Sequence, residues 1–147
     1  MEFDRDLYSI QEVRNAVAAA KAAQEIYRTF DQAKVDAIVA KIAGACAAQA
    51  ERLAKMVVEE TGFGVWQDKV LKNLLGSTMT YDYIKDMKTV GVLSDDRENG
   101  LMEVGVPMGV VAALIPSTNP TSTVMYKVLI SLNQQVLQLI TMTHHKH

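Results

Sequence analysis

An unbroken apolar segment, Gly109–Ile115, constrains the fold of this chain more than any other feature. The segment has no polar face, and strands buried on both sides are typical of parallel sheets that carry helices on each face. Pro116 ends the segment, and a polar loop at 117–119 leads to Pro120, which suits the first position of a helix. The pattern predicts the strand–loop–helix opening of an α/β unit, with a helix over about 121–132.

Alanine and proline divide the chain into two parts of different character. Fifteen of the seventeen alanines lie before position 55, whereas all three prolines lie at position 107 or later. Because alanine favours helix and proline punctuates turns, we expect helices over most of residues 10–87, followed by strands and loops.

Capping signals predict where the first two helices begin. The S-x-x-E pattern at Ser9–Glu12 has the form of a capping box, and Asp31 is a suitable N-cap for the second helix. Gln24 interrupts the apolar face of the first helix. The residues expected to face inward from these two helices are Val13, Val17, Ala20, Ile26, Tyr27, Phe30, Val35, Ile38, Val39 and Ile42.

Two further helices and an edge strand are predicted before the apolar segment. The third helix covers about 49–60 and is stopped by the glycines of Thr61–Gly64, and the fourth covers 65–87 with a possible break at Gly76–Ser77. A polar turn at 94–100 follows the helices. Residues 101–106 then read as a short edge strand.

Composition excludes several classes of protein. The 147 residues carry a formal net charge of −2 with no block of like charges, which does not fit a nucleic-acid binder. No apolar run approaches the roughly 18 residues of a membrane span. A single cysteine fits a reducing compartment, so we expect a cytoplasmic protein.

The polar loop between the two prolines has a functional and a structural interpretation. Loops at the carboxyl ends of parallel strands are where open α/β sheets bind ligands, and a helix N-terminus attracts negative charge. Asn119 is also a preferred N-cap before Pro120, which explains the same residues by structure alone. The two interpretations are compatible, because a capping asparagine still has an amide to offer.

Five linked sequence blocks resemble the CoA-acylating branch of the aldehyde dehydrogenase superfamily. They are ETGFG (Glu60–Gly64), DKVLKN (Asp68–Asn73), KTVGVLS (Lys88–Ser94), PMGVV (Pro107–Val111) and IPSTNPTST (Ile115–Thr123). The blocks follow the order and spacing of that branch, and the resemblance covers about residues 9–132.

The resemblance implies a fold, a reaction and two cofactors. The fold expected is of the α/β class, with N-terminal helices followed by the start of a truncated Rossmann-like parallel sheet. Residues 1–132 would form the N-terminal part of the cofactor-binding domain. The family oxidises a small aldehyde with NAD(P) and passes the acyl group from a cysteine to coenzyme A, or runs from acyl-CoA in reverse.

The resemblance also implies the residues of the site. Ile115, Pro116, Ser117 and Thr118 are expected to contact the cofactor, and Asn119 is the candidate donor to the oxyanion that forms on the aldehyde. In the wider superfamily this asparagine lies two residues before the second proline. That position is Thr118 here, so Thr118 is the alternative donor.

Residues 133–147 do not resemble the family, and we expect them to form a divergent tail without a second buried strand. The segment that carries the nucleophilic cysteine is also missing. We therefore expect a chain that is inactive by itself and binds neither cofactor. The alternative is a non-catalytic interaction protein that docks on a full-length homologue. A buried-type strand with a free edge further predicts self-association, or partial disorder after Leu132.

The remaining candidates favour structural roles. Cys46 lies in an alanine-rich helix without a basic neighbour, so it is expected to act as a small apolar residue. Lys69 and Lys72 are expected to be solvated, and no metal site is predicted. The histidines are expected to belong to a frayed terminus and the large aromatics to the core or a helix face: His144, His145, His147, Trp66, Tyr81, Tyr83 and Tyr126.

Overall fold

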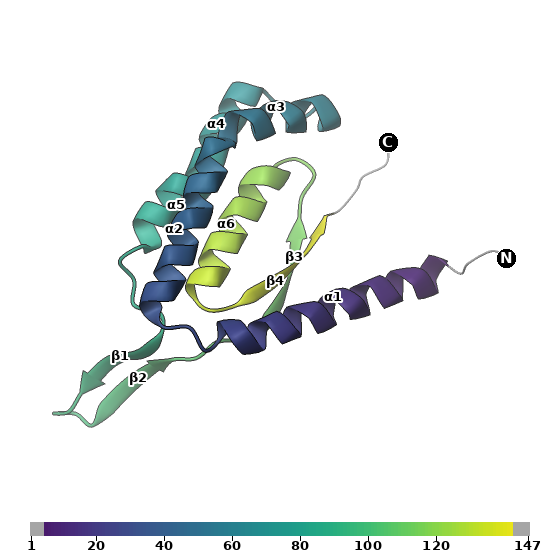
Figure 1. Cartoon of the computed structure of the whole chain (residues 1–147). Helices are drawn as coiled ribbons and strands as arrows, with labels where there is room; N and C mark the ends of the chain where they lie inside the picture. Colours follow the sequence, from purple (N-terminus) through teal and green to yellow (C-terminus); the bar gives the residue numbers. More distant parts are fainter. Residues whose placement is uncertain (1–4, 143–147) are drawn as a thin grey trace.

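A computed structural model of the chain describes the backbone of residues 5–142 and the side chains of residues 6–136 (Figure 1). Its helices are α1 (Arg5–Tyr27), α2 (Gln32–Ala48), α3 (Ala50–Thr61), α4 (Trp66–Leu74), the π-helical turn η1 (Leu75–Met79), α5 (Thr80–Ile84) and α6 (Pro120–Asn133). The strands are β1 (Gly91–Asp96), β2 (Leu101–Gly105), β3 (Val110–Ile115) and β4 (Leu137–Met142). Helices followed by the start of a parallel sheet confirm the expected α/β class. Helices also occupy most of residues 10–87, as predicted.

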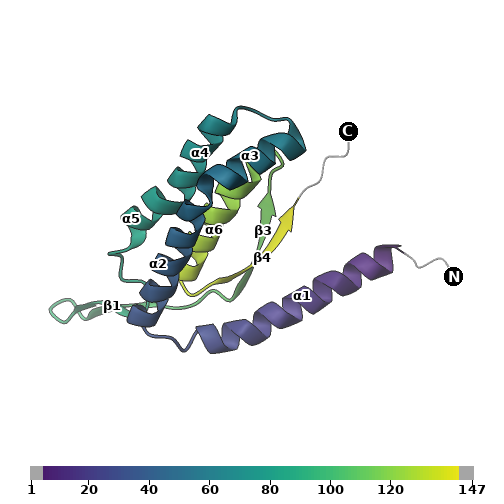
Figure 2. The ribbon, with the colours of Figure 1, turned by 45° about the horizontal axis from the view of Figure 1, so that its top comes forward.

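The parallel pair β3–β4 positions the polar loop. The strands pair in register from Val110 opposite Leu137 to Ile115 opposite Met142, and α6 connects them as the crossover of a βαβ unit. In both views the pair lies between α6 and α1, and both helices contact it (Figures 1 and 2). This confirms the predicted strand, loop and helix.

The expectation that no second strand follows Leu132 is wrong, because β4 begins at Leu137. Four of its six residues, LQLITM, are apolar, which suits a strand that pairs with the apolar β3. The pairing consists of backbone hydrogen bonds, which do not depend on a family motif. The histidines at 144, 145 and 147 lie outside the described residues.

The first helix begins earlier than predicted and uses Gln24 as a contact. α1 starts at Arg5, so Ser9 lies inside it and does not cap it. Gln24 is buried and donates from Nε2 to the carbonyl of Gln135, 2.7 Å away, while Gln135 Nε2 donates to the Phe30 carbonyl at 2.7 Å. The polar interruption therefore joins the end of α1 to the turn before β4. The expectation that Val13 and Ile26 face inward is wrong, because they are 54% and 64% exposed.

The boundaries of α2 and α3 confirm the local signals. The Asp31 side chain accepts a hydrogen bond from the Lys34 backbone N at 2.9 Å, and Gly62 ends α3 in the left-handed region at φ 68°. The core gathers residues of α1, α2, α5 and α6. They are Tyr27, Val35, Val39, Ala43, Ile84 and Leu129.

The predicted fourth helix continues through the expected break. At Leu75–Met79 it becomes a π-helical turn, and Thr80 Oγ1 donates to the Leu75 carbonyl at 2.7 Å. Such single turns inside α-helices are frequent at functional sites. Gly76 therefore marks a change of helical geometry within a continuous element.

The segment before β3 forms a hairpin where a turn was expected. β1 pairs antiparallel with β2, so the turn shrinks to about residues 97–100, and the strand predicted at 101–106 is confirmed as β2. The hairpin projects from the body of the chain in Figures 1 and 2, and every β1 residue is exposed. The polar residues Ser94 and Asp95 led to the prediction of a turn here. A strand in an exposed hairpin does not need an apolar face, so its sequence can be polar.

The strand β3 is buried on one face only by the described residues. Ala113 and Ile115 are buried on one face, where Val111 is 41% exposed, whereas Ala112 and Leu114 on the other face are exposed, Leu114 by 66%. The prediction of burial on both faces is wrong for this part of the chain.

Among the described residues, no helix is long and apolar enough to cross a membrane.

Tyr27→Phe tests the junction between α1 and α6. Tyr27 Oη donates to the Leu132 carbonyl at 2.9 Å, and burial raises the pKa of Tyr27 from 10 to about 12. Loss of the hydrogen bond should lower the free energy of unfolding by about 1 kcal/mol at neutral pH. Because the folded pKa is raised, the contribution of the neutral phenol is complete below pH 10 and is lost as pH rises through 12.

The measurement is urea unfolding from pH 8 to 12, with Tyr83→Phe as the control at an exposed tyrosine. The difference between wild type and Tyr27→Phe should shrink above pH 10. A difference that stays constant to pH 12 would show that the Tyr27 phenol does not titrate differently in the two states.

A candidate ligand site at the start of α6

The loop Pro116–Asn119 leads from the carboxyl end of β3 into the first turn of α6. Pro120 occupies the first helical position as predicted, and Asn119 is the N-cap residue. The Asn119 side chain makes no capping hydrogen bond, however, so the structural interpretation holds for its position and not for its side chain. The N-terminus of α6 therefore has no side-chain acceptor from its own cap residue and remains suited to negative charge.

Two lysines of α4 contact this loop. Lys69 Nζ donates to the Thr118 carbonyl at 2.6 Å, and Lys72 Nζ donates to Asn119 Oδ1 at 3.1 Å. Lys69 is only 6% exposed, whereas Lys72 is exposed. The expectation that both lysines are solvated is wrong for Lys69, because the packing of α4 on α6 brings the loop over its side chain.

The loop region is electropositive. Burial first, and the positive charge of Lys72 second, lower the pKa of Lys69. The ion pairs of the described residues include none with either lysine. Two ammonium groups without a carboxylate, beside a helix N-terminus, suit an anion such as a phosphate of a nucleotide cofactor or coenzyme A.

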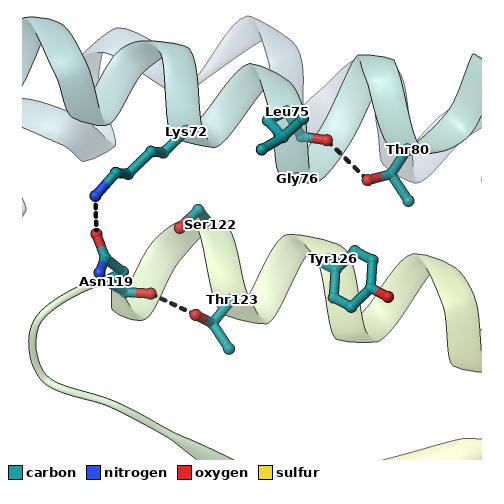
Figure 3. Close-up of a pocket in the computed structure, with 8 residues that line it drawn as sticks. All are labelled: Lys72, Leu75, Gly76, Thr80, Asn119, Ser122, Thr123 and Tyr126. Atoms are coloured by element: carbon teal, nitrogen blue, oxygen red, sulfur yellow. Dashed lines mark hydrogen bonds between the residues drawn. The ribbon is translucent and has the colours of Figure 1, made fainter.

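A pocket of about 530 Å³ lies between η1 and α6 (Figure 3). Its polar side chains come from α4, α5 and the start of α6, and the ring of Tyr126 also lines it. Its lining residues are Lys72, Leu75, Gly76, Thr80, Asn119, Ser122, Thr123 and Tyr126. Figure 3 shows Lys72 and Asn119 joined at one end of the pocket and Tyr126 at the other. The volume suits a small ligand, and the mostly apolar lining with a few hydroxyl groups suits one that has both apolar surface and a polar group.

A buried asparagine holds the two walls of this pocket together. Asn73 is 1% exposed, and its Nδ2 donates to the Ala50 carbonyl at 2.8 Å while its Oδ1 accepts from Thr121 Oγ1 at 2.8 Å. Ser77 Oγ donates to the Asn73 carbonyl at 2.6 Å. These bonds connect α3, α4, η1 and α6. They hold α4 at a fixed distance from the start of α6, and therefore also hold the lysines of α4 close to the loop.

The absence of a side chain at Gly76 permits the close approach of η1 to α6. A Cβ atom added there would lie 2.6 Å from the Ser122 carbonyl oxygen and 3.4 Å from Ser122 Cα. The helical glycine is thus required by tertiary contact. Its φ is ordinary, so the left-handed region plays no part.

The structure brings together only part of the site predicted from sequence. Asn119 lines the pocket, but Ile115 is buried beneath the loop, and Pro116, Ser117 and Thr118 do not line the pocket. Sequence reasoning missed Lys69, Lys72 and the pocket residues of α6. The i, i+3 spacing of the two lysines in the DKVLKN block was the available signal, but a helix face alone does not show what covers it.

The single cysteine does not line the pocket beside this loop. Cys46 is half-buried in α2, and burial raises the pKa of its thiol, which disfavours the nucleophilic thiolate. Its raised pKa fits the expected small apolar role. Within the described part of the chain, no group of three or more potential ligands is placed to hold a metal ion.

Comparisons of this chain with family models, with known sequences and with solved structures all match one protein family. The model of the "Aldehyde dehydrogenase family" matches residues 6–136. The bifunctional aldehyde-alcohol dehydrogenase AdhE of Escherichia coli K12 is 43% identical over 124 residues, which are 84% of this chain and 14% of AdhE.

Two solved structures resemble the chain closely in backbone. An acetylating aldehyde dehydrogenase from Geobacillus thermoglucosidasius superposes with a TM-score of 0.93 at 48% identity, covering 97% of this chain and 31% of that protein. A propionaldehyde dehydrogenase from Rhodopseudomonas palustris with bound propionyl-CoA has a TM-score of 0.73 at 29% identity. The match covers 88% of this chain and 28% of that protein. The chain thus spans less than a third of the length of these relatives.

The Gly76 contact predicts opposite effects of the same substitution at two helical glycines. Gly76→Ala should lower the free energy of unfolding by about 1–3 kcal/mol, because the new methyl group meets backbone that has no room to move. Gly44→Ala in α2, where no atom lies within 4 Å of the added Cβ, should raise it by about 0.5–1 kcal/mol. Urea unfolding of both variants measures the difference, and equal shifts would refute the close approach.

Proposed function

The chain belongs to the aldehyde dehydrogenase family, and we propose that it acts as the N-terminal part of a CoA-acylating member that interconverts an aldehyde and an acyl-CoA with NAD(P). The observation that carries this proposal is the loop itself. It follows a parallel strand and leads into α6, where the N-cap side chain of Asn119 makes no capping hydrogen bond. It also contacts two lysines that have no carboxylate partner. The names of the acetylating and propionyl-CoA-bound relatives support the acylating branch.

In this proposal the residues of the loop have separate roles. Pro116, Ser117 and Thr118 form the side of the loop that faces the cofactor, where the start of α6 suits its phosphates, and the buried Ile115 supports this side of the loop from beneath. NAD(P) would accept hydride and coenzyme A would accept the acyl group. Asn119 donates a hydrogen bond to the aldehyde oxygen as negative charge develops on it, and Thr118 is the alternative donor. The aldehyde occupies the pocket between η1 and α6.

The nucleophile in this proposal is not Cys46. A thiolate that attacks an aldehyde requires an electropositive and accessible setting, whereas burial raises the Cys46 pKa. We therefore propose that the chain by itself has no dehydrogenase activity and that its site is completed by further polypeptide. The proposed compartment is the cytoplasm, on the evidence of the single cysteine.

A second candidate function is docking, without catalysis, on a full-length homologue or on a second copy. The exposed apolar residues of β3 and of the hairpin favour it, since Leu114, Met102 and Val104 are each more than half exposed. Apolar strands left open recruit another chain. Both candidates place further polypeptide against the sheet, and they differ in whether the loop takes part in turnover.

A chimera tests the proposed reaction. Residues 6–136 would replace the matched segment of the Geobacillus acetylating aldehyde dehydrogenase, which supplies the remaining polypeptide. The chimera should reduce NAD(P) with acetaldehyde in a CoA-dependent reaction, followed by absorbance at 340 nm. A folded chimera with no such activity, beside an active parent enzyme, would contradict the proposed function.

Asn119→Ala in that chimera should lower kcat by about 10²–10³, because an oxyanion donor acts mainly in the transition state. In the isolated chain the same substitution should change the free energy of unfolding by less than the ~1 kcal/mol expected for loss of a cap, because the side chain makes no capping bond. Thr118→Val is the matched test of the alternative donor. If Asn119→Ala strongly lowers the free energy of unfolding and leaves kcat unchanged, the role of Asn119 is structural and the proposed oxyanion donor is wrong.

Self-association is the expected behaviour of the isolated chain in solution. Light scattering at increasing concentration should give a mass above the 16.2 kDa of one chain. Leu114→Lys should reduce the association by placing a charge on the exposed face of β3, whereas Val65→Lys, at another exposed apolar residue, should not. A monodisperse monomer at all concentrations would contradict this prediction.

A further inference from the structure

We propose that Lys72 is a positioning residue that sets the orientation of the Asn119 side-chain amide. This inference rests on the proposed function, in which that amide donates to the aldehyde oxygen. It concerns a residue that the sequence suggested to be merely solvated. Three features of the structure support it.

The first feature is the hydrogen bond itself. Lys72 Nζ lies 3.1 Å from Asn119 Oδ1. An ammonium group only donates, so it accepts no bond from an amide NH₂, and the oxygen must be the atom that faces it. The ambiguity between the two ends of an asparagine amide is thereby removed, and Nδ2 becomes the end available to another acceptor (Figure 3).

The second feature is a rigid base for Lys72. One turn earlier on the same helix, Lys69 holds the loop backbone through the Thr118 carbonyl at 2.6 Å. The helix itself is fixed on α6 through Asn73 and Thr121, whose side chains are 2.8 Å apart. Loop and helix are thus joined at two points before Lys72 makes its contact, so the lysine acts from a defined position.

The third feature is that Asn119 is not held by its own helix. Its side chain makes no capping bond, while its backbone carbonyl accepts from Thr123 Oγ1 at 2.7 Å. The backbone of the residue is therefore fixed, but the rotation of the amide is not. Among the described residues, the bond from Lys72 is the contact that determines this rotation.

The same bond affects the chemistry of the amide. A charged donor on Oδ1 draws electron density from the amide and strengthens the donor character of Nδ2. Because Lys72 is exposed, water competes for its ammonium group, and the effect is smaller than the loss of Asn119 itself. We expect Lys72→Met to lower kcat about tenfold, against about 10²–10³ for Asn119→Ala.

The first experiment observes the amide directly in the full chain. The chain contains five asparagines, so selective ¹⁵N-asparagine labelling gives five side-chain NH₂ groups, and Asn119→Ala assigns the relevant one. Lys72→Met should shift the Asn119 NH₂ resonances, and Lys72→Arg, which also only donates, should largely restore them. Lys127→Met is the control, since it removes a lysine that bonds to the Leu114 carbonyl at 2.8 Å and does not touch Asn119.

The second experiment is a double-mutant cycle in the chimera. If Lys72 acts through Asn119, Lys72→Met should lower kcat with little change in KM for acetaldehyde, and it should have no further effect in the Asn119→Ala background. Lys127→Met should leave the cycle unchanged. Lys72→Arg should recover most of the lost kcat.

The outcomes separate this inference from the proposed function. Asn119 resonances that respond no more to Lys72→Met than to Lys127→Met would overturn the inference, and so would fully additive effects on kcat. An unsubstituted chimera without CoA-dependent activity, combined with the expected change in the NH₂ resonances, would overturn the proposed function and support the orientation of the amide by Lys72.

Discussion

The close approach of η1 to α6 is the constraint on which the rest of the site depends. Backbone meets backbone at Gly76 and Ser122, where a methyl group would have no space. Asn73 satisfies polar groups of α3 and α6 from within the same contact. Because a buried amide that loses its partners is costly, this arrangement has few alternatives. The elements on either side of the pocket are consequently held at one separation.

That separation explains why two lysines of α4 donate hydrogen bonds to a loop almost fifty residues later in the chain. Lys69 is buried and reaches the loop backbone, whereas Lys72 is exposed and reaches the Asn119 side chain. A buried ammonium group is unfavourable without a nearby acceptor, and the Thr118 carbonyl supplies one. The result is a positive region beside the start of α6, which is suited to phosphate groups or to charge that develops during a reaction.

The apolar face of β3 shows a different kind of dependence. Leu114 has the side chain of a core residue and is nevertheless 66% exposed. The hairpin β1–β2 likewise stands away from the body (Figures 1 and 2). Its apolar residues Leu101, Met102 and Val104 are more than half exposed. Exposed patches of this kind mark surfaces that other polypeptide covers. This supports both proposed functions, since each places further protein against the sheet.

The sequence by itself determined the features that depend on neighbouring residues: the caps at Asp31 and Gly62, and the passage from an apolar strand through Pro116 to a helix at Pro120. Each follows from backbone preferences that act over a few residues. Only the tertiary structure decided that Gln24 is buried, that Lys69 is not solvated and that Lys72 bonds to the Asn119 amide. These contacts join residues 47 to 111 positions apart. Local propensity does not set the distance between two helices, so such contacts appear only when the elements pack.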